Sequence, residues 1–336
     1  MTSPVDIAVV GATGLVGELL VELLEERDFP VGTLHVLGAG EAVGHALPFK
    51  GRNLRVRDAA TFDFAQVRLV FLAGEGGHVE DLDERLNIAG CDVIDLVGAL
   101  PPATLTWVVA EANGDRLAGA VAPFRVGNPC SPTILLASVL APLRTVLALR
   151  RITVTACLAV SSRGREGVGE LARQTAELLN ARPLEPRVFE GQMAFNLLGV
   201  VEDRDAEGHG RLERRVHDEL RDVLGLPALE VAATCIQVPV FFGDSLSVSV
   251  LAEQPVDLPR LRELLAGAAG LEVAGDDECP SVVGDAVGQD VVHVGRLRLG
   301  LHDPRELNLW IASDNVRKGA ALNAVQSAEL LIKHYL

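Results

Sequence analysis

The residues that could do chemistry in this chain gather at positions 127–133, which read Gly-Asn-Pro-Cys-Ser-Pro-Thr and lead into an apolar segment over 134–143. The spacing predicts that Cys130 lies at the N-terminus of a helix. Free amides and the positive end of the helix dipole favour a thiolate there, the nucleophile that acyl transfer requires. The alternative is a proline-containing turn in which Ser131 or Thr133 caps a structural helix and the cysteine only packs.

The composition limits the class of protein. The chain has 336 residues, 49% of them hydrophobic, and a formal net charge of −16. A chain of this length and hydrophobic content can bury two cores. The acidic balance, without a Lys/Arg cluster, argues against a nucleic-acid partner. We therefore expect a protein that binds a small molecule, whose identity the sequence leaves open.

Cysteine usage and the N-terminal residues indicate a compartment. The five cysteines are odd in number and show neither CxxC pairing nor histidines at metal spacing. This pattern favours a reducing compartment and predicts no metal site. The chain begins with no basic and apolar leader, and no run approaches the ~20 apolar residues that cross a bilayer. We therefore expect a cytoplasmic protein without membrane contact.

The first part of the chain has the pattern of a dinucleotide-binding domain. A β-branched run at 5–10 is followed by Gly-Ala-Thr-Gly-Leu-Val-Gly at 11–17, and apolar side chains recur at helical spacing over 15–26. A glycine loop between strand and helix lets backbone amides bind a pyrophosphate. The alternative is a tight turn without a ligand.

Strand-like runs continue at 33–37, 69–72 and 92–96, alternating with helical or loop stretches. This series is typical of a parallel, doubly wound sheet, so we predict a Rossmann-type domain over 1–127. Glu41 follows the second run, where an acidic side chain suits the ribose 2′-hydroxyl of NAD and a basic one suits the 2′-phosphate of NADP. Glu41 therefore disfavours NADP, unless it is a solvated loop carboxylate.

A second domain is predicted over 128–315. Its strand-like runs lie at 151–160, 234–242, 245–251 and 307–312, with a helix that ends at 179. Long strands with few crossovers predict an open mixed sheet, covered on one face by helices and free on the other for a partner subunit. The apolar segment 316–336 is predicted to be a helix that packs back on the first domain.

Five motifs in order resemble those of the aspartate-semialdehyde dehydrogenase family. They are residues 11–17, Asn128-Pro129, Phe195-Asn196, residues 238–243 and residues 313–321. The likeness covers nearly the whole chain and is greatest to the Usg-type paralogues of that enzyme. It implies a Rossmann domain, a C-terminal catalytic and dimerisation domain, and a homodimer. The family reduces aspartyl-4-phosphate with NADPH: a cysteine attacks the acyl group, a histidine assists, and the thioester accepts hydride.

Carried over residue by residue, the family's catalytic pattern fails. The nucleophile position falls on Ser131, the preceding asparagine on Cys130, and the histidine on Asp244. An alcohol without a strong base is a far weaker nucleophile than a thiolate. A carboxylate does not replace an imidazole near neutral pH unless burial raises its pKa by several units. The glutamine that orients the nucleophile's region falls on Leu158.

The groups that bind the substrate's anions are also replaced. The arginine that grips the carboxylate falls on Gln237, and the arginine that clamps the phosphate falls on Pro101. The family's nucleotide-phosphate loop becomes Gly-Ala-Gly-Glu-Ala at 38–42, without hydroxyl or guanidinium. NAD or NADP binding could therefore be vestigial.

Other positions are kept. Glu213 and Arg215 match the family's substrate-binding glutamate and phosphate-facing lysine, although both also fit the exposed face of a helix, on which Glu219 is an i+4 partner of Arg215. The resemblance implies cofactor contacts at the following residues: Gly11, Thr13, Gly14, Leu15, Val16, Ser161 and Asn315.

Three hypotheses follow. The first, which the combined replacements favour, is a pseudoenzyme that keeps the fold and has lost the family reaction. The second is a dehydrogenase of altered chemistry, in which Cys130 attacks an apolar, uncharged aldehyde and Asp244 acts as base. The third is an active aspartate-semialdehyde dehydrogenase of amino-acid biosynthesis, in which a shifted register restores Cys130 to the nucleophile position. The shifted register does not restore the family residues at four other positions, so we rank the third hypothesis last. These positions are Pro101, Leu158, Gln237 and Asp244.

Overall fold

The structure, a computed structural model, describes residues 3–74 and 82–334. The chain divides into two compact units. The first comprises Met1–Pro129 and Ala320–Leu336, and the second comprises Cys130–Gly319. The break lies two residues beyond the predicted end of the first domain at residue 127. The C-terminal end of the chain returns to the first unit.

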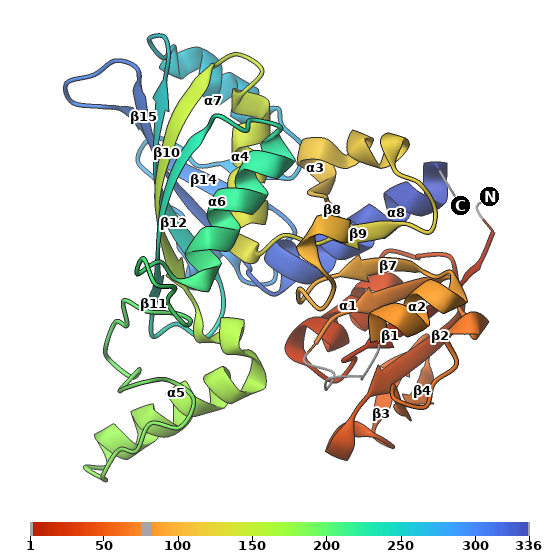
Figure 1. The fold of residues 1–336 in the computed structure, drawn as a ribbon. Coiled ribbons are helices and arrows are strands. Elements are labelled where there is room, and N and C mark those ends of the chain that lie inside the picture. Colours follow the sequence, from red (N-terminus) through yellow and green to blue (C-terminus); the bar gives the residue numbers. More distant parts are fainter. Residues whose placement is uncertain (1–2, 75–81, 335–336) are drawn as a thin grey trace. The chain divides into compact units, whose positions relative to one another are not determined.

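A parallel sheet forms the centre of the first unit (Figure 1). Within the described residues its order is β5-β2-β1-β6-β7-β9-β8, and every pairing is parallel. The strands are β1 (Val5–Val10), β2 (Val31–Gly38), β5 (Arg57–Asp58), β6 (Leu69–Leu72), β7 (Asp92–Asp95), β8 (Thr106–Trp107) and β9 (Arg125–Gly127). A separate hairpin pairs β3 (Ala46–Phe49) with β4 (Arg52–Arg55). The predicted doubly wound sheet is confirmed.

Helices cover both faces of this sheet because alternate strand residues are apolar on both sides. Ile7 and Val9 of β1 share one core with residues of two helices, whereas Ala8 and Val10 share another with Leu86 of a third. The helices of this unit are α1 (Leu15–Glu26), α2 (Leu82–Ala89), α3 (Ala110–Asn113) and α8 (Asn323–His334). Helices α1 and α8 line the first core and α2 lines the second.

The C-terminal segment differs from the single helix predicted over 316–336. A π-helical turn, Arg317–Leu322, precedes α8, and the last two residues lie outside the described part. The cause is Asp314, whose carboxylate accepts from the backbone N–H groups of Val316 and Arg317 and whose carbonyl accepts from Gly319 N. These bonds widen the first turn, so the regular helix starts only at Asn323.

A mixed sheet forms the centre of the second unit, in the order β11-β10-β12-β15-β14-β13. β10 pairs in parallel with β11, as β13 does with β14, and the other pairings are antiparallel. The strands are β10 (Leu149–Leu158), β11 (Glu230–Gln237), β12 (Asp244–Ala252), β13 (Leu271–Val273), β14 (Val292–Leu299) and β15 (Glu306–Ser313). The helices are α4 (Ser131–Leu143), α5 (Gly164–Leu179), α6 (Arg211–Leu224) and α7 (Leu258–Ala266). The predicted mixed sheet is confirmed.

One face of this sheet is covered and the other is open. Along β10 the side chains of Ile152 and Val154 are buried, whereas Thr153 is exposed and Thr155 is half-buried. Helix α4 lies against the covered face and is buried along nearly its whole length, beside α6 (Figure 1). A strand with this alternation has one face in a core and one available to solvent or a partner.

The predicted strand at 234–242 is wrong at both ends. β11 begins at Glu230 and ends at Gln237, because Pro239 has no N–H for a ladder and Val240 N instead bonds back to Val238 O. The residues that follow run across the end of β10, where Val240 O accepts from Val160 N. No helix in the described part of the chain is long and apolar enough to cross a membrane.

Candidate active site

The glycine loop of the first unit forms a close-packed turn. Gly11 has a φ of +79°, and a Cβ built there would lie 2.6 Å from the Cα of Gly74. A Cβ at Gly17 would lie 2.2 Å from the carbonyl oxygen of Gly11. Only glycine fits at these two positions, since each site is filled by backbone. The loop therefore keeps the compact shape that a pyrophosphate cradle needs.

Helix α1 opens from this loop. Its N-cap residue is Gly14, so no side-chain cap satisfies the N–H groups at this end of the helix. Thr13, Leu15 and Val16 are half-buried on the same turn. The structure thus brings together five predicted cofactor residues at a helix N-terminus, where amides and dipole suit a phosphate. These residues fit the phosphates of a dinucleotide.

Glu41 lies near the end of β2 that adjoins the glycine loop. The N–H groups of Gly11 and Ala12 both donate to Leu37 O, which ties the loop to this strand. Glu41 is exposed in the short 3-10 turn Gly40–Ala42 that follows the strand. Its carboxylate stands at the strand end where a nucleotide ribose would lie in such a fold.

In the second unit, Cys130 is the N-cap residue of α4 but is buried. Its Sγ lies 3.1 Å from Thr133 Oγ1, and its N–H donates to Glu219 Oε2 over 2.8 Å. Burial raises the pKa of the Cys130 thiol well above its usual range, and the Glu219 carboxylate raises it further. The predicted effect of the helix dipole is outweighed, because desolvation and a neighbouring negative charge both oppose ionisation.

Ser131 and Asp244 are brought together. Ser131 Oγ donates to Asp244 Oδ2 over 2.7 Å, and Asp244 Oδ1 accepts from Ala159 N over 3.0 Å. Burial raises the pKa of Asp244 to about 7, against the opposing effect of these hydrogen bonds. Its carboxyl group therefore exists in both protonation states near neutral pH. A Cβ on Gly319 would lie 2.4 Å from Ser131 Oγ, so the serine side chain packs tightly against that backbone.

Two of the predicted catalytic residues, Cys130 and Asp244, therefore have different hydrogen-bond partners. The hydrogen bonds of Asp244 go to Ser131 and Ala159, whereas Cys130 contacts Thr133 and Glu219. The alternative in which Asp244 serves Cys130 as a base has no supporting contact among the described residues. The contact that exists joins Ser131 and Asp244, the positions where the resemblance to the family predicts a cysteine and a histidine.

Gln237 is buried at the end of β11 and its amide group is fully engaged. Nε2 donates to the carbonyl oxygens of Leu158 and Ala159, each over 2.8 Å, and to Ser162 Oγ over 3.2 Å. A neutral amide committed to the backbone cannot replace a guanidinium that grips a carboxylate. Ser161 and Asn315 are joined: Ser161 Oγ donates to Asn315 Oδ1 over 3.0 Å.

The loop that follows β7 leads to Pro101, where the resemblance predicts that a phosphate-clamping arginine is replaced. Asp95 is buried, and its carboxylate accepts from the N–H groups of Val97, Gly98 and Leu100. These amides are therefore used inside the protein and are not available to a phosphate. The side chains of residues 97–101 are hydrocarbon or absent.

Glu213 and Arg215 both have structural partners on and around α6. Glu213 accepts from Gly210 N over 2.9 Å and from Cys235 N over 3.0 Å. Arg215 Nε donates to Glu219 Oε1 over 2.7 Å, and the same carboxylate holds Cys130 N. The i to i+4 pair foreseen in the sequence thus exists, and Glu219 is buried between α6 and α4.

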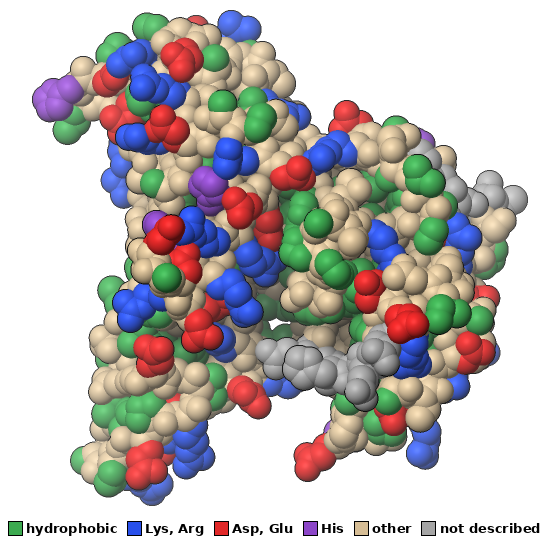
Figure 2. All heavy atoms as spheres, viewed as in Figure 1, with side chains coloured by type: hydrophobic (Ala, Val, Ile, Leu, Met, Phe, Trp, Pro, Cys, Tyr) green, Lys and Arg blue, Asp and Glu red, His purple; other side chains and the backbone are tan. Residues whose placement is uncertain are grey.

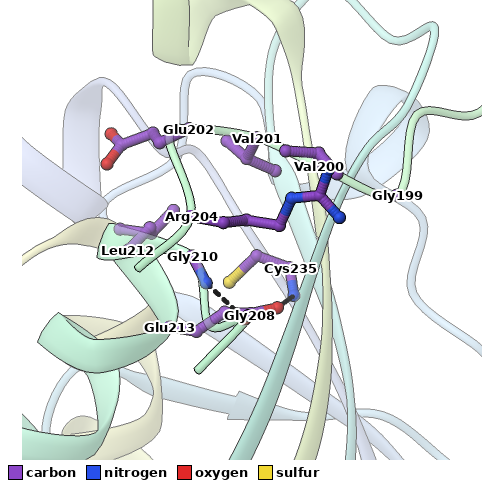
Figure 3. A pocket seen from close by; sticks show the side chains of 10 residues that line it. All are labelled: Gly199, Val200, Val201, Glu202, Arg204, Gly208, Gly210, Leu212, Glu213 and Cys235. Carbon is purple, nitrogen blue, oxygen red and sulfur yellow. Dashed lines mark hydrogen bonds between the residues drawn. The ribbon is translucent and has the colours of Figure 1, made fainter. Parts of the chain in front are cut away.

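A small cavity lies beside β11, an edge strand of the second unit's sheet (Figure 3). Its volume is about 120 Å³, and Glu213 and Cys235 belong to its lining. Arg204 also lines it, from a loop that no motif singles out. Sequence reasoning missed Arg204, because its position depends on how the loop before α6 folds. No group of three or more His, Cys, Asp or Glu in the described residues could hold a metal ion.

Two family models match the chain. The model described as "Semialdehyde dehydrogenase, NAD binding domain" matches residues 6–120, and "Semialdehyde dehydrogenase, dimerisation domain" matches residues 140–318. A USG-1 protein homolog of Azotobacter vinelandii is 56% identical over 99% of both chains. Aspartate-semialdehyde dehydrogenase 2 of Vibrio cholerae is 36% identical over 100% of both chains.

Solved structures show the same likeness. A probable aspartate-semialdehyde dehydrogenase from Pseudomonas aeruginosa has a TM-score of 0.95 and 53% identity, covering 99% of this chain and 100% of that one. An aspartate semialdehyde dehydrogenase II from Vibrio cholerae also has a TM-score of 0.95, with 35% identity over 99% of this chain and 100% of that one.

Proposed function

Because the chain belongs to the semialdehyde dehydrogenase family, we propose that it is a member that keeps the family's two domains and has lost the family reaction. One observation carries the proposal. The positions that match the family's cysteine and histidine are occupied by Ser131 and Asp244, which are hydrogen-bonded to each other. The only nearby thiol in the same turn, Cys130, is buried and held neutral by a raised pKa. These positions therefore hold neither a thiolate for acyl transfer nor an imidazole for the proton transfers that accompany it.

The lost anion-binding groups support the same proposal. Gln237 is bonded to backbone carbonyls, and the loop before Pro101 is held by Asp95. A substrate with a carboxylate and a phosphate would leave both charges without the charge-assisted hydrogen bonds that fix it.

The experiment is a steady-state assay with aspartate semialdehyde, phosphate and either NADP or NAD, beside an active family enzyme as positive control. We expect no phosphate-dependent reduction of either cofactor. Turnover at a rate near that of the positive control would overturn the proposal.

A second candidate is acyl transfer by Ser131 with Asp244 as general base. One observation favours it: the hydroxyl donates directly to a carboxyl group whose pKa is raised to about 7 by burial. A base of that pKa beside an alcohol is suitable for catalysis at neutral pH. Two features weigh against it. Ser131 packs tightly on Gly319, and a carboxylate next to the reacting carbonyl repels the developing oxyanion.

For the cofactor, we propose that the glycine loop binds NAD more tightly than NADP. Glu41 supports this, since its carboxylate suits a 2′-hydroxyl and repels a 2′-phosphate. Calorimetric titration should give a lower Kd for NAD. In Glu41→Arg the preference should shift toward NADP, whereas the charge-matched change Glu84→Arg on α2 should not shift it. Tighter NADP binding by the unaltered protein would contradict the proposal, and no binding of either nucleotide would mark the site as vestigial.

We further propose a homodimer that works in the cytoplasm. The match of residues 140–318 to a dimerisation-domain model supports the dimer, and the five unpaired cysteines support a reducing compartment. The open face of the second unit's sheet offers the surface. At its centre, Thr155 of β10 pairs with Ser247 of β12, which also pairs with Trp310 of β15, and Ser247 is exposed. A two-fold symmetric dimer would bring the same face of two copies together.

A further inference from the structure

We propose that residues 164–198 form an arm that contacts a second copy of this chain, with Phe195 and Leu197 as its apolar anchors. The arm consists of α5 and the segment 180–198 that follows it. The inference deepens the proposed homodimer and rests on it, because it adds a second contact surface to the open face of the sheet. It needs neither cofactor binding nor catalysis.

The arm packs little against the rest of its own unit. Figure 1 shows α5 projecting away from the mixed sheet. Among the described helices and strands, only the short 3-10 turn Val160–Arg163 packs substantially against α5. The buried residues of the apolar cluster at this place are Val160, Leu171, Phe189, Met193 and Ala194. A projection with so few buried side chains leaves apolar surface for a further contact.

Apolar side chains are exposed where the arm returns to the sheet. Phe195 is 67% exposed and Leu197 is 60% exposed. In the same view as Figure 1, Figure 2 shows hydrophobic side chains on the surface of the arm among acidic and basic ones. Leu198 then joins the sheet, because its N–H donates to Gln237 O and its carbonyl oxygen accepts from Gln237 N. An aromatic and a leucine side chain exposed so close together are the kind of apolar feature that a partner covers.

The backbone holds Phe195 in a strained conformation in which its side chain is exposed. Its φ is +59°, in the left-handed region that bulky residues rarely adopt. The buried side chain of Gln174 fixes the preceding residues, because Oε1 accepts from Met193 N over 2.7 Å and from Ala194 N over 3.1 Å. Asn196 N donates to Met193 O over 3.2 Å and closes the turn. Strain of this kind persists where the surrounding structure imposes it, and it clusters at functional sites.

Gln174 is in turn held by charged groups of the arm. Its Nε2 donates to Glu170 Oε1 over 2.7 Å, and Glu170 also accepts from Arg187 N over 2.9 Å. Arg173 forms an ion pair with Glu170 over 2.7 Å. These contacts join α5 to the segment that follows it, so the turn that carries Phe195 is fixed before a partner binds. A contact that is fixed in advance loses little conformational freedom on association.

Two observations point to a second copy of this chain as the partner. The dimerisation-domain model matches residues 140–318, a range that includes the whole arm. The arm also returns to the sheet at β11, and the open face of that sheet is the surface proposed for the homodimer. In a two-fold interface each contact occurs twice, so the arm of each copy would lie against the other copy. The arm and the sheet face then form one continuous interface.

The test is the dissociation constant of the dimer, measured by sedimentation velocity over a dilution series of the full chain. We expect Phe195→Gly to raise this constant about tenfold or more, as truncation of an aromatic anchor does at many interfaces. Glycine suits the positive φ of residue 195, so the variant should fold, and its circular dichroism is measured in parallel. The matched control is Leu301→Gly, because Leu301 is 96% exposed between β14 and β15, outside the arm. The control should dimerise as tightly as the wild type.

Three results would overturn the inference. A dimeric wild type with an unchanged dissociation constant in Phe195→Gly would remove the arm and leave the homodimer standing. Equal weakening in Phe195→Gly and Leu301→Gly would also remove the arm, since the effect would not be specific to it. A monomeric wild type would overturn the homodimer and the arm together. Turnover in the enzyme assay would refute the proposed loss of reaction without affecting this result.

Discussion

At the scale of single residues, Ser131 and Asp244 form a partly buried hydrogen bond at the positions where the family resemblance implies a thiol and an imidazole. The carboxyl group is 1% exposed and accepts from Ser131 and from Ala159 N. The bond ties the start of α4 to the start of β12. We expect this hydrogen bond to affect the stability of the folded protein and the way that stability varies with pH.

Asp244→Asn is expected to change how stability varies with pH. The pKa of Asp244 is raised to about 7 in the folded protein, against about 3.9 in an unfolded chain. Between these values the folded state binds the proton and the unfolded state does not, so the group's contribution is complete below about pH 4 and is lost as pH rises through 7. The loss is at most about 4 kcal/mol.

The measurement is the melting temperature at several pH values between 5 and 8. Wild type should lose stability relative to Asp244→Asn as the pH rises, because asparagine cannot ionise. Asp203→Asn, at an exposed position in the same unit, should run parallel to wild type. Parallel curves for wild type and Asp244→Asn would contradict the raised pKa.

At the scale of elements, the spacing of apolar residues predicts where the long buried helices and strands lie. It does not predict the ends of those elements where individual side chains determine them. The limits of β1 and α1 agree with the sequence pattern, because both are bounded by the glycine loop. β11 was misplaced, since Pro239 ends the ladder at a point that apolar character does not reveal. The π-helical turn before α8 depends on Asp314, and its bonds to the backbone leave no periodic signal.

The candidate site was foreseen in the same uneven way. The sequence predicts site positions at Ser131, Gln237 and Asp244 from the spacing of family motifs, and the structure adds the hydrogen bond between Ser131 and Asp244. The burial of Cys130 could not be predicted, since it arises from α6 packing against α4. Arg204 was missed, because it reaches its place through an irregular loop.

Glu219→Ala is expected to destabilise the packing of α6 on α4. The buried carboxylate of Glu219 satisfies Cys130 N and Arg215 together, and its removal leaves both without that partner. Loss of a buried charged acceptor typically costs about 2–4 kcal/mol. Urea unfolding measures this change, and Asp218→Ala at the exposed neighbouring position should cost far less. Equal effects of the two variants would mean that the contacts contribute little.

At the scale of the whole molecule, the two units correspond to the NAD-binding and dimerisation domains of the family. The first unit keeps the glycine loop and a parallel sheet, and the second keeps the mixed sheet with one open face. The proposed loss of the reaction would make the fold of both domains separable from catalysis.

Ser247→Arg is expected to dissociate the proposed homodimer. Ser247 is exposed between Thr155 on β10 and Trp310 on β15, so arginine is tolerated by a single chain and places two cations face to face in a symmetric interface. Sedimentation velocity should show a dimer for wild type and a monomer for the variant. Asn53→Arg, on the exposed hairpin of the first unit, should remain dimeric. A monomeric wild type, or a dimeric Ser247→Arg, would rule out this face.

The most direct measurement of the central claim is the intact mass of the protein after incubation with aspartate semialdehyde and oxidised cofactor, without phosphate. A working nucleophile would hold the acyl group after hydride transfer, and peptide mapping would locate it. We predict an unchanged mass, because Cys130 is buried and neutral and Ser131 is bonded to Asp244. An added acyl group on either residue, absent when that residue is changed to alanine, would contradict the loss of the family reaction.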